Sequence, residues 1–176
     1  MISIEQPALA VHSHDVPGYK YKMDYTVKLD ASATIETVVM QVLISAKKAG
    51  GKLKNLVINS HGSPGHLYVG ENNTINFNNL SRFRVTNITQ PLIDRIWIVA
   101  CEVAGYHRQI VNLGFPFCSE LAKAAGCEVV ASNRSQYVNP GFYLRFCPKN
   151  HIDNYEGEVW LWDKNGKRQS FNPNGF

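Results

Sequence analysis

Short apolar runs that lack polar alternation mark the strands of a sheet in this chain. The two clearest runs extend from Leu53 to Ser60 and from Arg95 to Ala100. Runs of this kind are typical of parallel strands that are covered on both faces. Each run ends abruptly in a reactive side chain, with His61 after the first and Cys101 after the second.

A different spacing of apolar residues predicts helices. From about Ser32 to Ala49 they recur at three- and four-residue intervals and form one apolar stripe, and two glycines follow. The same criteria predict a helix from about Pro116 to Ala125, which ends at Gly126. A further helix is expected between Asn79 and Leu92.

The remaining patterned segments predict strands. Tyr19 to Leu29 alternates large and polar residues, which predicts a strand with one buried face, the first of the sheet. The other predicted strands lie in a hairpin within residues 65–77 and in the segments Cys127 to Ala131, Phe142 to Phe146, Glu158 to Trp162 and Arg168 to Phe171. Because strand, helix and strand follow one another twice, the pattern predicts an α/β fold with right-handed crossovers.

The length of 176 residues predicts a single domain with a substantial core. Residues 1–18 are interpreted as an N-terminal segment packed across the surface, and residues 142–176 as a β-rich C-terminal extension. His12 and His14 form an H-x-H pair that can hold a metal. No further ligand lies nearby in the sequence, so the surface segment is the preferred interpretation.

Composition and charge narrow the class of protein. Hydrophobic residues make up 44% and charged residues 18%, which is typical of a globular chain. The net charge is +4, but the basic residues are scattered, so nucleic-acid binding is not favoured. No apolar stretch approaches the roughly 20 residues that span a bilayer. No secretory signal is visible, so we expect a cytoplasmic protein, or one delivered to a target cell by a signal-peptide-independent route.

The cysteines predict neither a disulfide framework nor a zinc site. Four cysteines are spread along the chain without a C-x-x-C pair. In a reducing compartment Cys118, Cys127 and Cys147 are interpreted as small buried hydrophobic residues. We therefore expect no metal and no cofactor.

Chemistry is expected where His61 and Cys101 follow their strands. In open α/β sheets, functional groups gather outside the carboxyl ends of the strands, so the two side chains meet if their strands are neighbours. A cysteine thiol has an ordinary pKa of about 8.5, and a nearby imidazole helps to generate the thiolate. The backbone N–H groups of Gly62 and Cys101 can hold an oxyanion, at about 3 kcal/mol for each donor removed. His107 is a rival base, but no predicted element fixes its position. The competing interpretation is a buried structural Cys101 and a loop His61.

The segments Leu56 to Gly62 and Ile96 to Cys101 resemble the His-Gly and Ala-Cys signatures of the caspase-like cysteine peptidases. This superfamily includes caspases, clostripain, gingipains and the self-cleaving domains of large bacterial toxins. The chain is most similar to a bacterial branch with Ser-His-Gly-Ser-Pro-Gly and Cys-x-Val-Ala-Gly motifs. The matching segments are Ser60 to Gly65, Val69-Gly70, Cys101 to Gly105 and Ala131-Ser132.

The resemblance implies a three-layer caspase-like fold with a mostly parallel central sheet, flanking helices and a C-terminal β-hairpin. It implies a dyad in which His61 is the general acid/base and Cys101 the nucleophile, with the Gly62 and Cys101 amides as the oxyanion hole. The implied function is a cysteine endopeptidase that cleaves protein or peptide substrates through a thioester. Glu102 departs from the family pattern, which often has a small or polar residue after the nucleophile.

The places where family members form the substrate pocket correspond to Asp30, Glu102 and the segment Ser132, Asn133 and Arg134. A pocket made acidic by Asp30 or Glu102 favours Lys or Arg in the substrate, whereas Arg134 favours Asp or Glu. Both alternatives stay open, as does the oligomeric state.

Two other functions fit the same sequence. A cysteine-dependent deamidase or acyltransferase effector uses the same dyad and oxyanion hole. A non-catalytic protein-binding module retains the fold alone. Its contact surface is then formed by the aromatic residues Tyr143, Trp160, Trp162 and Phe171. The alternative interpretation of these aromatic residues is a hairpin face packed on the core.

Overall fold

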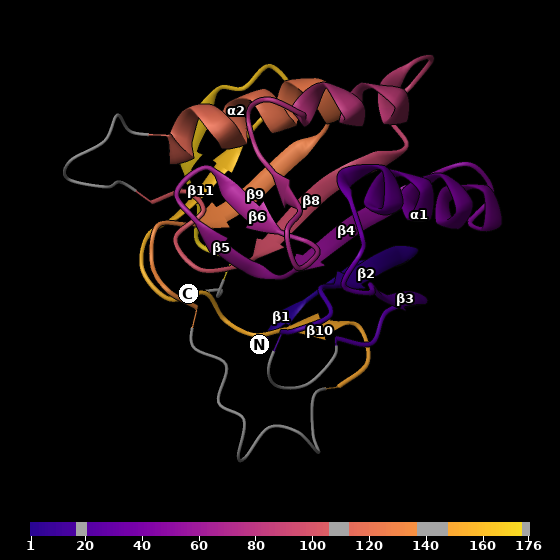
Figure 1. The fold of residues 1–176 in the computed structure, drawn as a ribbon, viewed down its shortest axis with the longest axis horizontal. Coiled ribbons are helices and arrows are strands. Elements are labelled where there is room, and N and C mark those ends of the chain that lie inside the picture. Colours follow the sequence, from indigo (N-terminus) through magenta and orange to yellow (C-terminus); the bar gives the residue numbers. More distant parts are fainter. Residues whose placement is uncertain (17–20, 106–112, 137–147, 174–176) are drawn as a thin grey trace.

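The computed structural model describes residues 1–16, 21–105, 113–136 and 148–173 (Figure 1). In these ranges the chain forms an α/β fold around a seven-stranded sheet with the order β12-β11-β9-β8-β4-β2-β3. In that order the strands are Arg168–Ser170, Val159–Trp162, Glu128–Ser132, Ile93–Val99, Leu53–Asn59, Ala8–His12 and Tyr25–Lys28. The sheet is mixed, because the pairs from β3 to β9 are parallel, whereas β11 and β12 are added antiparallel.

Helices and two small sheets complete the described part of the chain. The helices are α1 (Ile35–Lys48), the 3-10 helix η1 (Leu80–Asn87) and α2 (Gly114–Ala125). A three-stranded sheet contains β5 (His61–Ser63), β6 (His66–Tyr68) and β7 (Thr74–Ile75), and β1 (Ile2–Ser3) pairs with β10 (His151–Ile152). No helix among the described residues is long and apolar enough to cross a membrane.

The helices cover one face of the main sheet. At the start of α1, Thr37 Oγ1 accepts the N–H of Thr34 at 3.1 Å, and Lys47 and Lys48 lie in the last turn, where cations suit the helix dipole. The core on this face joins residues of β2, β4, β8 and β9 to the helices. It includes Leu9, Leu56, Ile58, Ile96, Ile98 and Val129 from the strands, and Val38, Val42, Phe83, Phe117 and Leu121 from the helices.

The other face of the sheet carries no helix among the described residues. Tyr21 and Met23 pack there against Val57 and Trp97, together with residues of β1 and β10. Figure 1 shows α1 and α2 on one side of the sheet and β1 and β10 on the other. Tyr21 and Met23 belong to the connection between β2 and β3, and parallel neighbours need a connection that returns along the sheet. The predicted flanking helices are therefore found on one face only.

Strand β2 corrects the interpretation of residues 1–18 as a surface segment. Ala8–His12 is buried along its whole length and lies between β3 and β4, with Leu9 opposite Leu56 and His12 opposite Asn59. The sequence pattern joins β3 to β4 through α1. In the structure β2 lies between these two strands. The predicted first strand is shorter than expected and lies at the sheet edge. A five-residue strand with two alanines carries too little periodicity to be recognised.

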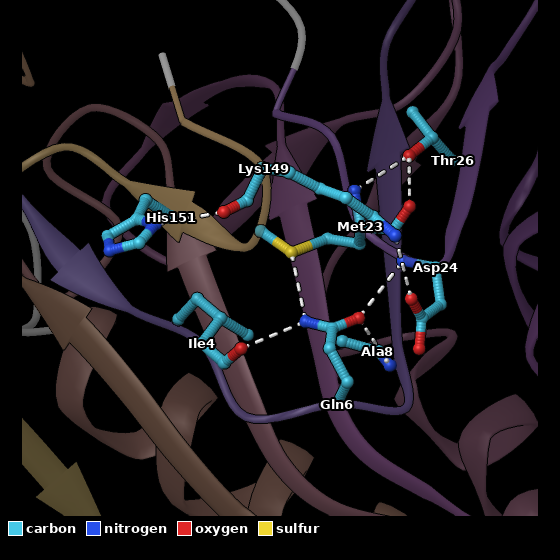
Figure 2. A network of polar contacts seen from close by, with 8 residues as sticks. All are labelled: Ile4, Gln6, Ala8, Met23, Asp24, Thr26, Lys149 and His151. Atoms are coloured by element: carbon cyan, nitrogen blue, oxygen red, sulfur yellow. Dashed lines mark hydrogen bonds and ion pairs between the residues drawn. The ribbon is translucent and has the colours of Figure 1, made fainter.

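Gln6 fastens the start of β2 to the chain just before β3 (Figure 2). Its Oε1 accepts the backbone N–H groups of Ala8 at 3.2 Å and of Asp24 at 2.9 Å. The Asp24 carboxylate also contacts Lys149 Nζ at 3.2 Å, next to β10. These contacts satisfy backbone groups at strand ends, which are costly to leave unpaired.

The other predicted elements keep their places with small shifts at their ends. β4, β8, β9, α2 and the C-terminal hairpin of β11 and β12 all occur where the pattern places them. The helix expected between Asn79 and Leu92 is the 3-10 helix η1. The segment His61–Ser63, expected as a loop, is the short strand β5. The strand predicted for residues 142–146 lies outside the described residues.

Replacement of Leu9 by alanine tests the central position of β2. Leu9 is fully buried, so the change should lower the free energy of unfolding by about 3 kcal/mol. Urea denaturation followed by circular dichroism measures the loss. Ile88→Ala is the matched control, because Ile88 is 76% exposed and its truncation should change stability by less than about 0.5 kcal/mol. Equal stability of the two variants would contradict a buried β2.

Candidate active site

The ends of β4 and β8 bring His61 and Cys101 to the same edge of the sheet. The two strands are parallel neighbours, and Asn59 lies opposite Val99 at their carboxyl ends. Ser60 N–H continues the pairing by donating to Val99 O at 3.2 Å. His61 and Cys101 each follow this last pair by two residues. Both residues therefore lie at the carboxyl edge of the two neighbouring strands.

His61 is half exposed and faces a carboxylate. Its Nε2 lies 3.9 Å from Asp15 Oδ2, and the two side chains are 47% and 48% exposed. Backbone pairing with Tyr68 of β6 positions His61 on β5. One ring nitrogen is thus directed toward the loop after β2, which leaves the other available to a neighbouring group.

Cys101 is the only cysteine among the described residues that reaches the surface, since Cys118 and Cys127 are buried. Burial raises the pKa of the Cys118 and Cys127 thiols far above the ordinary value, so both stay protonated and unreactive. The Cys101 thiol donates to the backbone carbonyl of Gln136 at 3.7 Å. Cys147 lies outside the described residues.

Two backbone N–H groups near Cys101 are available to a ligand. The N–H of Cys101 itself has no acceptor in the part of the chain that the structure describes. Ser63 and His66 flank the two-residue turn between β5 and β6, and such a flanking pair exchanges hydrogen bonds. The next pair, Gly62 and Leu67, is therefore not hydrogen-bonded, so the Gly62 N–H points to the open edge of β5.

Gly62 allows the two loops to approach each other. A Cβ at this position would lie 2.6 Å from Val103 Cγ2 and 2.8 Å from Cys101 O, closer than real contacts allow. From the sequence, glycine is expected here because a side chain at position 62 would obstruct the substrate carbonyl. The structure gives a second reason for glycine, because any side chain would push β5 away from Cys101.

Four of the five predicted pocket residues gather beside Cys101. Glu102 N–H donates to Arg134 O at 3.0 Å, which joins the segment after β8 to the segment after β9. The Ser132 hydroxyl donates to Glu156 O, and Asn133 Nδ2 donates to the Glu158 carboxylate at 2.9 Å, so both side chains hold the chain before β11. The Arg134 side chain is exposed.

Asp30 lies apart from this group. It follows β3, which β2 and β4 separate from β8. Its Oδ1 accepts the Ser32 N–H at 2.9 Å and the Ser32 hydroxyl at 2.7 Å. Asp30 therefore caps the loop before α1. This role, and not a place in the substrate pocket, is the one that an Asp two residues before a serine suggests.

The structure adds Asp15 and Gln136 to the site. Asp15 faces His61, and Gln136 provides the acceptor for the Cys101 thiol. The side chain of Gln136 fixes the position of this residue. Its Nε2 donates to Arg134 O at 3.0 Å, and its Oε1 accepts the Glu156 N–H at 3.2 Å. Recognition of β2 as a strand would have placed Asp15 at the same edge as His61.

His12 is buried beside the end of β4, and both of its ring nitrogens face polar groups of the protein. Asn59 Nδ2 donates to His12 Nδ1 at 2.9 Å, and His12 Nε2 lies 3.2 Å from Tyr21 O. With the Asn59 amide donating to Nδ1, the ring N–H lies on Nε2 and donates to Tyr21 O. No cluster of three or more potential metal ligands occurs among the described residues.

The aromatic residues near the C-terminus are packed against the protein. Trp162 is 1% exposed, and Trp160 and Phe171 contact the core from half-buried positions. Arg168 covers Phe115 and Trp160, with its guanidinium carbon 4.0 Å and 4.7 Å from their ring centroids. Tyr143 and the rival base His107 lie outside the described residues. The packing favours the hairpin-face interpretation over an aromatic contact surface.

Comparison with known proteins identifies no relative. No family model, no curated protein and no solved structure matches this chain. The chemical properties of His61, Cys101 and their surroundings therefore carry the functional assignment.

Proposed function

We propose that this protein is a cysteine endopeptidase in which Cys101 is the nucleophile and His61 the general acid/base. The pairing of Asn59 with Val99 is the observation that carries the proposal, because it directs both side chains to one edge of the sheet. Cys101 is partly exposed, which is compatible with access of a substrate to its thiol. A thiol beside an imidazole with backbone donors nearby supplies the three parts that acyl transfer needs.

The reaction proceeds through two proton transfers and a thioester. His61 accepts the thiol proton while the Cys101 sulfur bonds to the peptide carbonyl carbon, and the N–H groups of Gly62 and Cys101 hold the resulting oxyanion. The C–N bond then breaks, and His61 gives its proton to the leaving amine. Water attacks the thioester, His61 takes the water proton, the C–S bond breaks and the proton returns to sulfur. A substrate must first displace the Gln136 carbonyl from the thiol.

Several features support the resemblance to caspase-like peptidases. The parallel strands β4 and β8 lie side by side and end in the His-Gly and Ala-Cys motifs. The following strand, β9, is parallel to β8, and its carboxyl end brings Ser132 to Arg134 next to the nucleophile. We therefore propose that Glu102 and residues 132–134 form the primary specificity pocket. We also propose that the parallel strands from β3 to β9 correspond to the central sheet of a caspase-like fold.

Incubation with a library of peptides of known sequence tests this proposal against the deamidase and acyltransferase alternatives. Mass spectrometry should find new amino and carboxyl termini with the wild-type protein and none with Cys101→Ala. Deamidation instead raises peptide mass by about one dalton with no new terminus, because an amide side chain becomes a carboxylate. The residue before the cleaved bonds also decides the pocket charge. Absence of any Cys101-dependent product would overturn the proposal.

Gly62→Ala should lower kcat about a hundredfold, because displacement of β5 removes one oxyanion donor. KM should change less, since the donor acts mainly on the tetrahedral intermediate. Steady-state kinetics on a cleaved peptide measures both constants. Ser63→Ala is the matched control, because the Ser63 hydroxyl contacts Tyr68 OH at 3.0 Å on the surface. An unchanged kcat in Gly62→Ala would contradict the assignment of the Gly62 N–H to the oxyanion hole.

A further inference from the structure

The loop after β2 is held against the strand end that carries His61. β2 pairs with β4 up to His12 and Asn59, and Ser13 N–H then donates to Asn59 O at 3.0 Å. Ser13 is 2% exposed, so this attachment is buried. Asp15 comes two residues later. Its position relative to His61 is therefore determined by the paired strands.

The Asp15 carboxylate is oriented by its own loop. The Ser13 hydroxyl donates to Oδ1 at 3.1 Å, and His14 Nδ1 lies 3.6 Å from the same oxygen. The other oxygen, Oδ2, remains directed at His61 Nε2, 3.9 Å away. One oxygen thus anchors the carboxylate, and the other faces the proposed base.

We propose that Asp15 is a positioning residue for His61, which directs Nε2 toward the loop after β2 and Nδ1 toward Cys101. This inference rests on the proposed function. The imidazole becomes an imidazolium when it accepts the thiol proton, and a facing carboxylate favours that charged form. The Asp15 carboxylate is the acidic group whose contact with His61 the described structure shows, and backbone pairing places Tyr68 opposite His61.

The distance and exposure set the size of the effect. At 3.9 Å the contact between Asp15 Oδ2 and His61 Nε2 is longer than a hydrogen bond, and both side chains are half exposed. Exposed pairs of this kind contribute little to stability, so removal of the carboxylate should leave the fold intact. The loss should appear in the chemical step, because the ring is then free to turn away from the sulfur.

Asp15→Asn should lower kcat about tenfold with KM nearly unchanged. It should also slow alkylation of Cys101 by iodoacetamide about threefold, since the imidazolium that accompanies the thiolate loses its counter-charge. Asp15→Glu, which keeps the carboxylate, should recover part of both rates. Glu120→Gln is the charge-matched control, because Glu120 pairs with Lys123 on the surface of α2. Thermal unfolding of each variant reports on the fold.

The outcomes separate this inference from the proposed function. Wild-type rates of cleavage and alkylation in Asp15→Asn would overturn the positioning role. A lower melting temperature with no recovery in Asp15→Glu would also overturn it, because the role of Asp15 is then structural. If the wild-type protein cleaves no peptide but Asp15→Asn still slows alkylation of Cys101, the peptidase assignment fails and the positioning of His61 by Asp15 stands.

Discussion

Replacement of Cys101 by alanine is expected to abolish both peptide cleavage and labelling by an electrophilic thiol probe. The proposed reaction passes through a thioester on the Cys101 sulfur, and alanine offers no substitute nucleophile. Loss of a catalytic nucleophile reduces kcat by about ten-thousandfold or more. The side chain is small and only partly buried, so the variant should fold, which circular dichroism checks.

The labelling experiment is selective because the described cysteines differ in exposure. Cys118 and Cys127 are buried in the core, where desolvation raises the pKa of each thiol, so neither should react at neutral pH. Cys127→Ala is the matched control and should label as strongly as the wild type. Cys147→Ala covers the cysteine outside the described residues. Equal labelling of wild type and Cys101→Ala would contradict the assignment of Cys101 as the nucleophile. The non-catalytic binding module would then be the remaining proposal.

His61→Ala is expected to lower kcat/KM about a thousandfold, which is the usual contribution of a general acid/base. The variant should also react more slowly with the thiol probe, because no imidazole next to the sulfur takes its proton. Peptide cleavage and probe labelling at neutral pH give the two measurements. The side chain is 47% exposed, so its loss should not unfold the protein.

Two histidine variants serve as controls for His61. His66 lies on the same hairpin, where its Nδ1 contacts Pro64 O at 3.1 Å, and His66→Ala should keep its activity. His107→Ala should also keep its activity if His61 is the base. Activity retained in His61→Ala and lost in His107→Ala would reverse the assignment.

The helices and the two reactive strands could be predicted because their signals are local. The helix α1 and the strands β4 and β8, which carry the apolar stripe and the apolar runs, span at least seven residues each. Runs of that length have a clear period and clear ends. The reactive residues follow directly from those ends, so His61 and Cys101 could be named before any coordinates.

Other parts of the site depend on contacts between distant segments. β2 is short and rich in alanine, and Asp15 enters the site only because that strand pairs with β4. Gln136 contacts the thiol because the segment after β9 is bonded to Glu102. Asp30 carries the same chemical group as Asp15, but its strand lies at the sheet edge. The order of strands, and not the residue type, decides which acid reaches His61.

The amino-acid sequence by itself determined that apolar runs end in a histidine and a cysteine, because such runs must be buried and the polar residues that follow them must emerge. Only the tertiary structure decided which strands are neighbours, since strand order depends on pairing energies summed over the whole sheet. That order places Asp15 beside His61, Gln136 beside Cys101 and Asp30 away from both. The choice of the proposed nucleophile and base is thus a local property of the chain, whereas their surroundings are a property of the fold.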